Sequence, residues 1–174
     1  MGSITVTGLA MGDTGLTITS KTVPSVTTNV PVTVLSRNLL SYWPANASGL
    51  ACTVNTDGSL HLTGTPTAIW SGVKWRFPAP VTSGTICMSA KKSIPGLSLS
   101  MKFYDAQGQK VGDQLTPGKP LTIPDGAAKW QLELLCNSTP QPVDADLHVQ
   151  VETGETATTW MRPDDTSLSV GGGA

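Results

Sequence analysis

The sequence predicts an all-β protein whose main part is a β-sandwich. Short runs that alternate apolar and polar residues recur along the chain, and Gly-, Pro- and Asp-containing turn signals separate them. No segment keeps the period of three to four residues that an amphipathic helix requires. The 18 glycines and 13 prolines among 174 residues suit a chain with many turns.

Length and composition further narrow the class of protein to which this chain can belong. A chain of 174 residues fits one domain with a small appendage. Charged residues make up 13% and the net charge is -1, so the chain lacks the basic excess of a nucleic-acid-binding protein. We expect no nucleic-acid partner, no signal peptide and no membrane insertion, because neither a leader pattern nor a membrane-length apolar run is present.

Residues 1–36 read as an N-terminal arm for anchoring or assembly. Ile4, Val6, Leu16 and Ile18 alternate with threonine, yet the segment has no aromatic residue and Lys21 is its one positive charge. Two or three short strands of this kind are not stable alone. The arm must therefore pair with the main domain, with a copy of itself or with another protein. We expect domains over 1–36, 37–165 and a flexible Gly-rich tail over 166–174.

The main domain opens with a hairpin signal. Residues 50–55 and 59–64 alternate, and Thr56-Asp57-Gly58 joins them. Asp-Gly between alternating runs predicts a β-hairpin with a tight primed turn, because both residues tolerate positive φ.

Further strands are predicted downstream, and their alternation assigns faces. The expected strands are 51–55, 60–63, 73–77, 85–90, 97–104, 121–123, 129–135, 146–152 and 157–160. The side chains assigned to the core are Val73, Trp75, Phe77, Leu97, Leu99, Met101, Phe103, Trp130, Leu132, Leu134, Leu147, Val149 and Val151. Cys52, Cys87 and Cys136 lie in such runs and read as small buried hydrophobes, with one disulfide left open as a possibility.

Four features of residues 38–163 carry a resemblance. They are the opening Asn38-Leu39-Leu40 with Trp43 shortly after, the hairpin from Asp57-Gly58-Ser59 to Thr63-Gly64-Thr65, the strand from Gly84 to Ala90, and a closing Glu-x-Gly-x-x-Ala-Thr-x-Trp-x-x-Pro over 152–163. The arrangement resembles the carbohydrate-binding-module-like jelly rolls of phage and prophage virion proteins of capsid-decoration, head-fibre or tail type. Val149-Gln150-Val151 departs from the family's usual Pro-Gln-Leu. The resemblance implies a jelly-roll β-sandwich, in a family that includes both glycan binders and structural spacers.

A ligand site on such a sandwich needs an aromatic ring flanked by polar side chains. The candidate ligand-binding residues are Trp70, Tyr104, Lys74, Arg76, Gln131 and Glu133. These residues form one site only if their strands share a sheet. The alternative interpretation is that the polar side chains form a solvated or subunit-contacting surface and that Trp70 covers the end of the core. Trp43 and Trp160 are expected to close the core.

Catalysis is not expected. His61 and His148 occupy ordinary strand positions, and no nucleophile elbow, zinc-protease motif or phosphate loop is present. Asp144 and Asp146 are too few carboxylates to predict a calcium site. We expect no cofactor, no metal and no enzymatic activity.

The function predicted from these observations is that of a non-enzymatic bacteriophage structural protein on the virion surface. Residues 1–36 would bind other virion proteins of the capsid or tail lattice, and the protein would form a homo-oligomer, such as a trimer. The alternative is a tail-associated receptor-binding protein that recognises a host-surface glycan. A glycan-active enzyme is the third and weakest reading.

Overall fold

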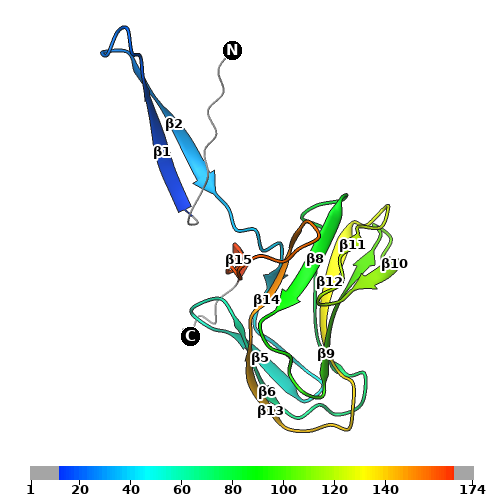
Figure 1. Cartoon of the computed structure of the whole chain (residues 1–174). Helices are drawn as coiled ribbons and strands as arrows, with labels where there is room; N and C mark the ends of the chain where they lie inside the picture. The colour runs from blue at the N-terminus through cyan, green and yellow to red at the C-terminus, as the bar shows by residue number, and fades with distance from the viewer. Residues whose placement is uncertain (1–11, 167–174) are drawn as a thin grey trace. The chain divides into compact units, whose positions relative to one another are not determined.

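The computed structural model describes residues 12–166 and shows an all-β protein (Figure 1). Within that range there is no helix, and so none able to cross a membrane. The chain divides between Ser36 and Arg37 into two compact units. The expectations for residues 1–11 and for the tail after Thr166 fall outside the described residues.

The first unit contains one antiparallel hairpin, β1 (Gly12–Thr19) and β2 (Thr27–Val34). Leu16 lies opposite Val30, and the backbone N–H of Ser20 donates to the carbonyl oxygen of Val26 over 2.9 Å at the turn. Residues directly opposite one another share a face. The register therefore places one set of side chains on an apolar face, namely Leu16, Ile18, Val30, Val32 and Val34 with Thr14 and Thr28.

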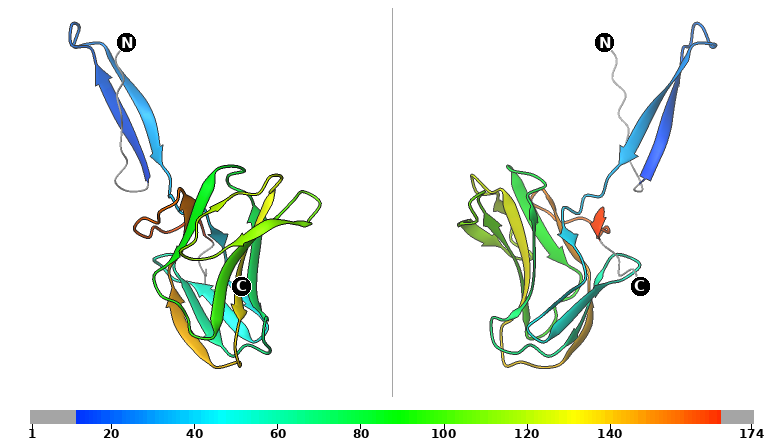
Figure 2. Two further views of the ribbon diagram at one scale, coloured as in Figure 1. Left: turned by 45° about the vertical axis from the view of Figure 1, so that its right-hand side comes forward. Right: turned by 180° about the vertical axis from the view of Figure 1, so that it is seen from behind.

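The second unit is a two-layered β-sandwich (Figure 2). One layer has the order β10-β9-β12-β7, with strands β10 (Lys110–Leu115), β9 (Leu97–Tyr104), β12 (Lys129–Cys136) and β7 (Gly72–Pro78). The other layer contains β11 (Leu121–Thr122), β8 (Thr85–Ala90) and β14 (Val149–Thr153), and beside them β13 (Val143–Leu147), β6 (Leu60–Gly64), β5 (Leu50–Val54) and β4 (Ala45–Ala47). Only His148 separates β13 from β14, so these two strands join the two parts of this layer.

A further two-stranded sheet is parallel. It consists of β3 (Ser41–Tyr42) and β15 (Asp165–Thr166). Thr166, which the sequence assigned to a flexible tail, is therefore the last residue of a paired strand.

The core lies between the two layers. Its residues confirm the prediction of which side chains on these strands point inward. Trp75, Trp130, Phe103, Met101 and Val151 are all 0% exposed. The ring of Phe103 stands edge-on to that of Trp130, with centroids 5.8 Å apart. The three cysteines are buried and free, so the disulfide left open by the sequence is not formed.

The predicted hairpin between β5 and β6 is present, but its turn differs from the prediction. The N–H of Gly58 donates to the carbonyl of Asn55 over 2.9 Å, and Gly58 has a φ of 88° while Asp57 has no positive φ. This is a type I turn followed by a left-handed glycine, the common three-residue hairpin loop, rather than a primed turn. A side chain at Gly58 would also collide with Arg162, because its Cβ would lie 2.4 Å from Cγ of that residue.

Four further expectations are corrected. Residues 157–160 form a loop and not a strand, because the backbone N–H of Thr158 donates to a side chain, Glu152, instead of a neighbouring strand. The run 146–152 is divided at His148 between two strands. Strand β10 was missed, since Gly112 and Asp113 interrupt its pattern. Trp43 is 40% exposed and does not close the core.

Candidate ligand-binding face

The outward face of the β10-β9-β12-β7 sheet brings together five of the six predicted ligand-binding residues. In the register, Gln131 lies between Lys102 and Arg76, and Glu133 lies between Ser100 and Lys74. Tyr104 lies opposite Lys129 at one end of the same face. We call this surface the polar face; it is defined by Lys74, Arg76, Ser100, Lys102, Tyr104, Lys110, Lys129, Gln131 and Glu133.

Arg76, Gln131 and Tyr104 form one contact group. The Nε–H of Arg76 donates to Oε1 of Gln131 over 2.8 Å, and the guanidinium carbon lies 4.0 Å from the centroid of the Tyr104 ring. Nε2 of Gln131 donates to the hydroxyl oxygen of Tyr104 over 3.3 Å. Arg76 is thus held by an amide and by the negative face of an aromatic ring.

Glu133 lies at the centre of the face and is only 1% exposed. Its Oε1 accepts a hydrogen bond from Nε2 of Gln131. Nζ of Lys102 lies 2.7 Å from Oε2, and Nζ of Lys74 lies 4.0 Å from Oε1. Oε2 is therefore buried and ion-paired with Lys102. The sequence placed Gln131 and Glu133 on this face but did not predict that both are buried.

Trp70 lies at the other end of the same sheet. It has a φ of 63°, is 66% exposed, and its backbone N–H donates to the carbonyl of Cys136 over 2.7 Å. Tyr104 lies opposite Lys129, seven residues away along β12. At about 3.4 Å per residue, these two backbone positions are about 24 Å apart along β12, so the structure does not bring Trp70 together with Tyr104. Trp70 is exposed and does not plug the core.

The candidates predicted from the sequence left out three basic residues of the polar face, which are Lys102, Lys110 and Lys129. Lys110 and Lys129 both lie opposite Tyr104 and point to the same side as that residue. With Lys74, Arg76 and Lys102 they place five of the chain's 11 basic residues on one sheet face. Glu133 is the one carboxylate among the paired residues of this face, and Asp105 borders it in the β9–β10 turn. The sequence spacing did not show this gathering, because it depends on the strand order.

A second polar group lies on β14. Gln150 is 0% and Glu152 3% exposed, and Nε2 of Gln150 donates to Oε1 of Glu152 over 2.6 Å. The hydroxyl and backbone N–H of Thr158 donate to the same carboxylate. Burial works to raise the pKa of Glu152, but these hydrogen bonds and the charge of Arg37 outweigh it and hold the pKa below its usual value.

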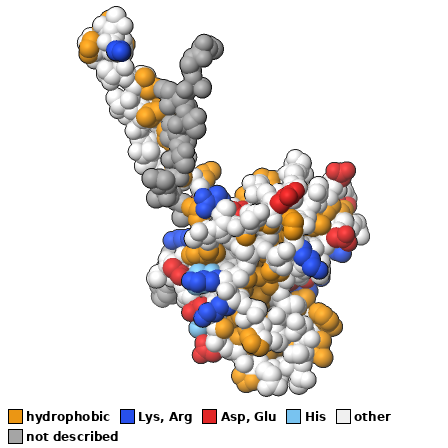
Figure 3. All heavy atoms as spheres, viewed as in Figure 1, with side chains coloured by type: hydrophobic (Ala, Val, Ile, Leu, Met, Phe, Trp, Pro, Cys, Tyr) orange, Lys and Arg blue, Asp and Glu red, His pale blue; other side chains and the backbone are white. Residues whose placement is uncertain are grey.

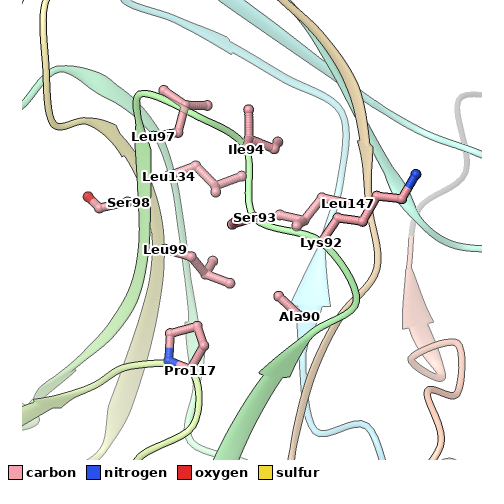
Figure 4. A pocket seen from close by; sticks show the side chains of 10 residues that line it. All are labelled: Ala90, Lys92, Ser93, Ile94, Leu97, Ser98, Leu99, Pro117, Leu134 and Leu147. Carbon is pink, nitrogen blue, oxygen red and sulfur yellow. The ribbon is translucent and has the colours of Figure 1, made fainter.

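Two other features, an apolar pocket and a histidine–aspartate pair, lie apart from the polar face. An apolar pocket of about 290 Å³ lies between the layers, lined by Ala90, Ile94, Leu97, Leu99, Pro117, Leu134 and Leu147 with Lys92, Ser93 and Ser98 (Figure 4). The ammonium of Lys92 points away from it, which leaves no charged group to orient a ligand (Figure 4). His61 bonds Asp146 through Nδ1 over 2.9 Å, but no group of three or more His, Cys, Asp or Glu among residues 12–166 is arranged to hold a metal.

Comparison with known proteins adds little. No family model matches the sequence, and no curated protein matches it. A solved structure with a similar chain is the crystal structure of accessory secretory protein 1, 2 and 3 in Streptococcus pneumoniae, with a TM-score of 0.48 and 12% identity. The similarity covers 70% of this chain and 98% of that one. A likeness of this extent supports no functional argument.

Proposed function

We propose that this protein is a non-enzymatic structural component of a bacteriophage particle, of the capsid-decoration or head-fibre type. The hairpin β1–β2 anchors it to other virion proteins or to sister subunits, and the β-sandwich is displayed on the virion surface. The virion assignment rests on the resemblance carried by residues 38–163. The anchoring role is supported by the hairpin.

The observation that carries the anchoring role is the apolar face of the hairpin. Figure 3 shows hydrophobic side chains, in orange, on the surface of the hairpin. Two residues of the apolar face, Ile18 and Val30, are 39% and 41% exposed. The opposite face is polar, and there the hydroxyl of Thr33 donates to Asp13 over 2.6 Å. A two-stranded ribbon with one apolar side is at most marginally stable in water. Covering that side with a partner would stabilise both the ribbon and the assembly.

The self-complementary character of this face favours a sister subunit as that partner. No charged residue lies on it, so that two copies can approach without burying an unpaired charge. Pro31 lies within β2 and lacks the N–H that an added strand would need, which favours packing through the face over extension of the sheet at β2.

The test replaces apolar residues of the face by threonine, which keeps the preference for strands. The triple variant Leu16→Thr, Ile18→Thr and Val30→Thr should be monomeric in light scattering and absent from purified particles. Val26→Thr, in the turn, is the matched control and should keep the oligomeric state and the incorporation of the unchanged chain. Full incorporation of the triple variant would contradict the proposal.

A second candidate function is that of a tail-associated receptor-binding protein that recognises a host-surface glycan. The observation in its favour is the polar face, which combines an aromatic ring, a buried amide and carboxylate, and several cations on one sheet.

A further inference from the structure

Lys102, Gln131 and Glu133 bring an amine, a carboxamide and a carboxylate together on the two central strands of one sheet. Lys102 on β9 lies directly opposite Gln131 on β12. Side chains paired in this way have Cβ atoms about 4.5–5.5 Å apart, so a lysine is long enough to reach the amide of its partner. Nζ of Lys102 lies 2.7 Å from Oε2 of Glu133, and Nε2 of Gln131 donates to Oε1 of the same carboxylate. One carboxylate therefore holds the amine and the amide nitrogen at its two oxygens.

The neighbours of Gln131 fix which end of its amide faces Glu133. The Nε–H of Arg76 donates to Oε1 of Gln131 over 2.8 Å. Because a guanidinium only donates and an ionised carboxylate only accepts, the amide oxygen must face Arg76 and the amide nitrogen must face Glu133. Arg76 is itself held over the ring of Tyr104. Its N–H is thus in place to stabilise negative charge that develops on the amide oxygen.

The amide and the carboxylate are shielded from water. Gln131 is 6% and Glu133 1% exposed, although both lie on the outward side of the sheet. Glutamine and glutamate on the outward side of a sheet are usually solvated, so their burial together needs a reason. Exclusion of water protects the amide from hydrolysis and strengthens the electrostatic interactions around it. The amine of Lys102 is the nucleophile that the register brings to this amide.

We propose that Lys102 and Gln131 join in an isopeptide bond within the chain, and that Glu133 transfers the protons. Glu133 takes a proton from the ammonium of Lys102, and the free amine attacks Cδ of Gln131. The electron pair of the carbonyl moves onto Oε1, where the Nε–H of Arg76 stabilises it. Glu133 then gives its proton to Nε2 and takes the second proton of the attacking nitrogen. The Cδ–Nε2 bond breaks, the carbonyl forms again, and ammonia leaves with that proton as ammonium.

The reaction is balanced without a co-reactant. A lysine ammonium and a glutamine carboxamide become a secondary amide and an ammonium ion, and Glu133 is a carboxylate again at the end. The new bond joins the two central strands in the order β10-β9-β12-β7 and closes residues 102–131 into a covalent loop. This inference goes beyond both candidate functions and depends on neither.

A second buried glutamine–glutamate pair shows what the reaction requires. Gln150 donates to Glu152 on β14, as in the pair on β12. The residue opposite Gln150 is Ser89, and the cation beside Glu152 is Arg37, with Nε 3.8 Å from Oε2. A guanidinium stays protonated and does not act as a nucleophile. We therefore expect a bond at Gln131 and none at Gln150.

The test is the mass of the folded full chain and of its tryptic peptides. We expect the intact chain to be lighter than its sequence by one molecule of ammonia, and to stay so after boiling in denaturant. Trypsin does not cleave after a bonded Lys102, and Arg162, the one basic residue after Lys129, precedes a proline. Digestion should therefore give one branched peptide, in which residues 93–110 are joined to residues 130–174.

Two variants test the roles of the amine and the carboxylate. Lys102→Arg keeps a cation beside Glu133 but removes the nucleophile, and Glu133→Gln keeps the shape but removes the proton transfer. Both should have the unmodified mass of their sequence. Lys92→Arg and Glu152→Gln are the matched controls and should keep the loss of ammonia. Circular dichroism shows whether each variant is folded, and Lys102→Arg should melt at a lower temperature than the bonded chain, because an unbonded chain gains more entropy on unfolding.

The unchanged chain decides the proposal whether or not a variant folds. An unmodified mass after prolonged incubation of the folded chain at neutral pH would overturn it. Loss of water in place of ammonia would also overturn it, because that would place the bond at a carboxylate and not at Gln131. Loss of ammonia that persists in Lys102→Arg would assign the reaction to other residues, and loss that persists in Glu133→Gln would contradict the role of Glu133.

Discussion

Thr158 donates both its hydroxyl and its backbone N–H to the buried carboxylate of Glu152, each over 2.7 Å. Nε of Arg37 donates to the hydroxyl oxygen of Thr158 over 3.2 Å. Nδ2 of Asn38 donates to the carbonyls of Val149 and Met161. The first residues of the sandwich unit and its closing loop therefore meet at β14. This explains physically why the opening and the closing motif occur together in one domain.

Replacing Thr158 by valine removes the hydroxyl with little change in volume. Glu152 then keeps the backbone hydrogen bond but loses the hydroxyl donor, which should cost about 1–3 kcal/mol of unfolding free energy. Urea denaturation measures this cost, and Thr158→Ser, which keeps the hydroxyl, should lose much less. Equal stability of the valine and serine variants would show that the hydroxyl contributes nothing.

The pKa of Glu152 predicts how stability depends on pH. The folded-state pKa lies below the ordinary glutamate value of 4.5, so the unfolded chain binds the proton more readily. The contribution of Glu152 is therefore complete above pH 4.5 and is lost as the pH falls through the folded-state pKa. The difference in urea midpoint between the unchanged chain and Glu152→Gln should shrink as the pH is lowered from 7 to 3. A difference that stays constant over this range would contradict the assignment.

Asp57 and Asp146 add to the same acid sensitivity. The hydrogen bonds from Ser59 lower the pKa of Asp57, and the hydrogen bonds from Asn55 and then His61 lower that of Asp146. Because folding lowers the pKa of both carboxyl groups, both stabilise the folded state above the ordinary aspartate pKa, and this stabilisation is lost as the pH falls. Both are surface groups, so their effect should weaken in high salt.

Two buried tryptophans should respond differently to the same substitution. Nε1–H of Trp75 donates to the carbonyl of Trp43 over 2.7 Å, whereas Nε1–H of Trp130 has no acceptor among the described residues. Both rings are 0% exposed, so replacement by phenylalanine leaves comparable cavities. Trp75→Phe also leaves a carbonyl unpaired and should cost about 1–2 kcal/mol more than Trp130→Phe in chemical denaturation. The reverse order would contradict the role given to the Trp75 hydrogen bond.

The strands of the sandwich could be predicted from the sequence because their alternation is local. The 97–104 run, with Met101 and Phe103 in the core, is an example that the structure confirms. Strand order is not local, so the row of Lys102, Gln131 and Arg76 could not be found from spacing. Alternation also shows on which side of the sheet a side chain lies, but it does not show how deeply that side chain is buried. It therefore placed Glu133 outward without showing that neighbouring lysines cover it.

The closing motif could be recognised but its structure could not be predicted. Residues 157–160 have the threonines and the tryptophan of a strand, yet Thr158 bonds the side chain of Glu152 and Nε1–H of Trp160 bonds the carbonyl of Val149. These tertiary hydrogen bonds override the local preference. Trp160 also lies edge-on to His148, with ring centroids 4.7 Å apart.

Cys52 and Cys87 should be unreactive in the folded protein. Burial raises the pKa of the Cys52 thiol to about 12, and burial together with the charge of Glu152 raises that of Cys87. Since the thiolate is the reactive form, a disulfide reagent should label neither residue at pH 7.5 until urea unfolds the chain. Rapid labelling of Cys52 or Cys87 under native conditions would show that the sandwich opens readily.

We propose that residues from Arg37 onward form the complete sandwich and that the hairpin β1–β2 connects it to the particle. The most direct measurement produces phage with residues 1–36 deleted from this protein and quantifies the protein in purified particles, beside urea unfolding of the deleted chain. We expect the deleted chain to unfold cooperatively and to be absent from the particles. Incorporation equal to that of the full chain, or loss of the folded sandwich on deletion, would contradict it.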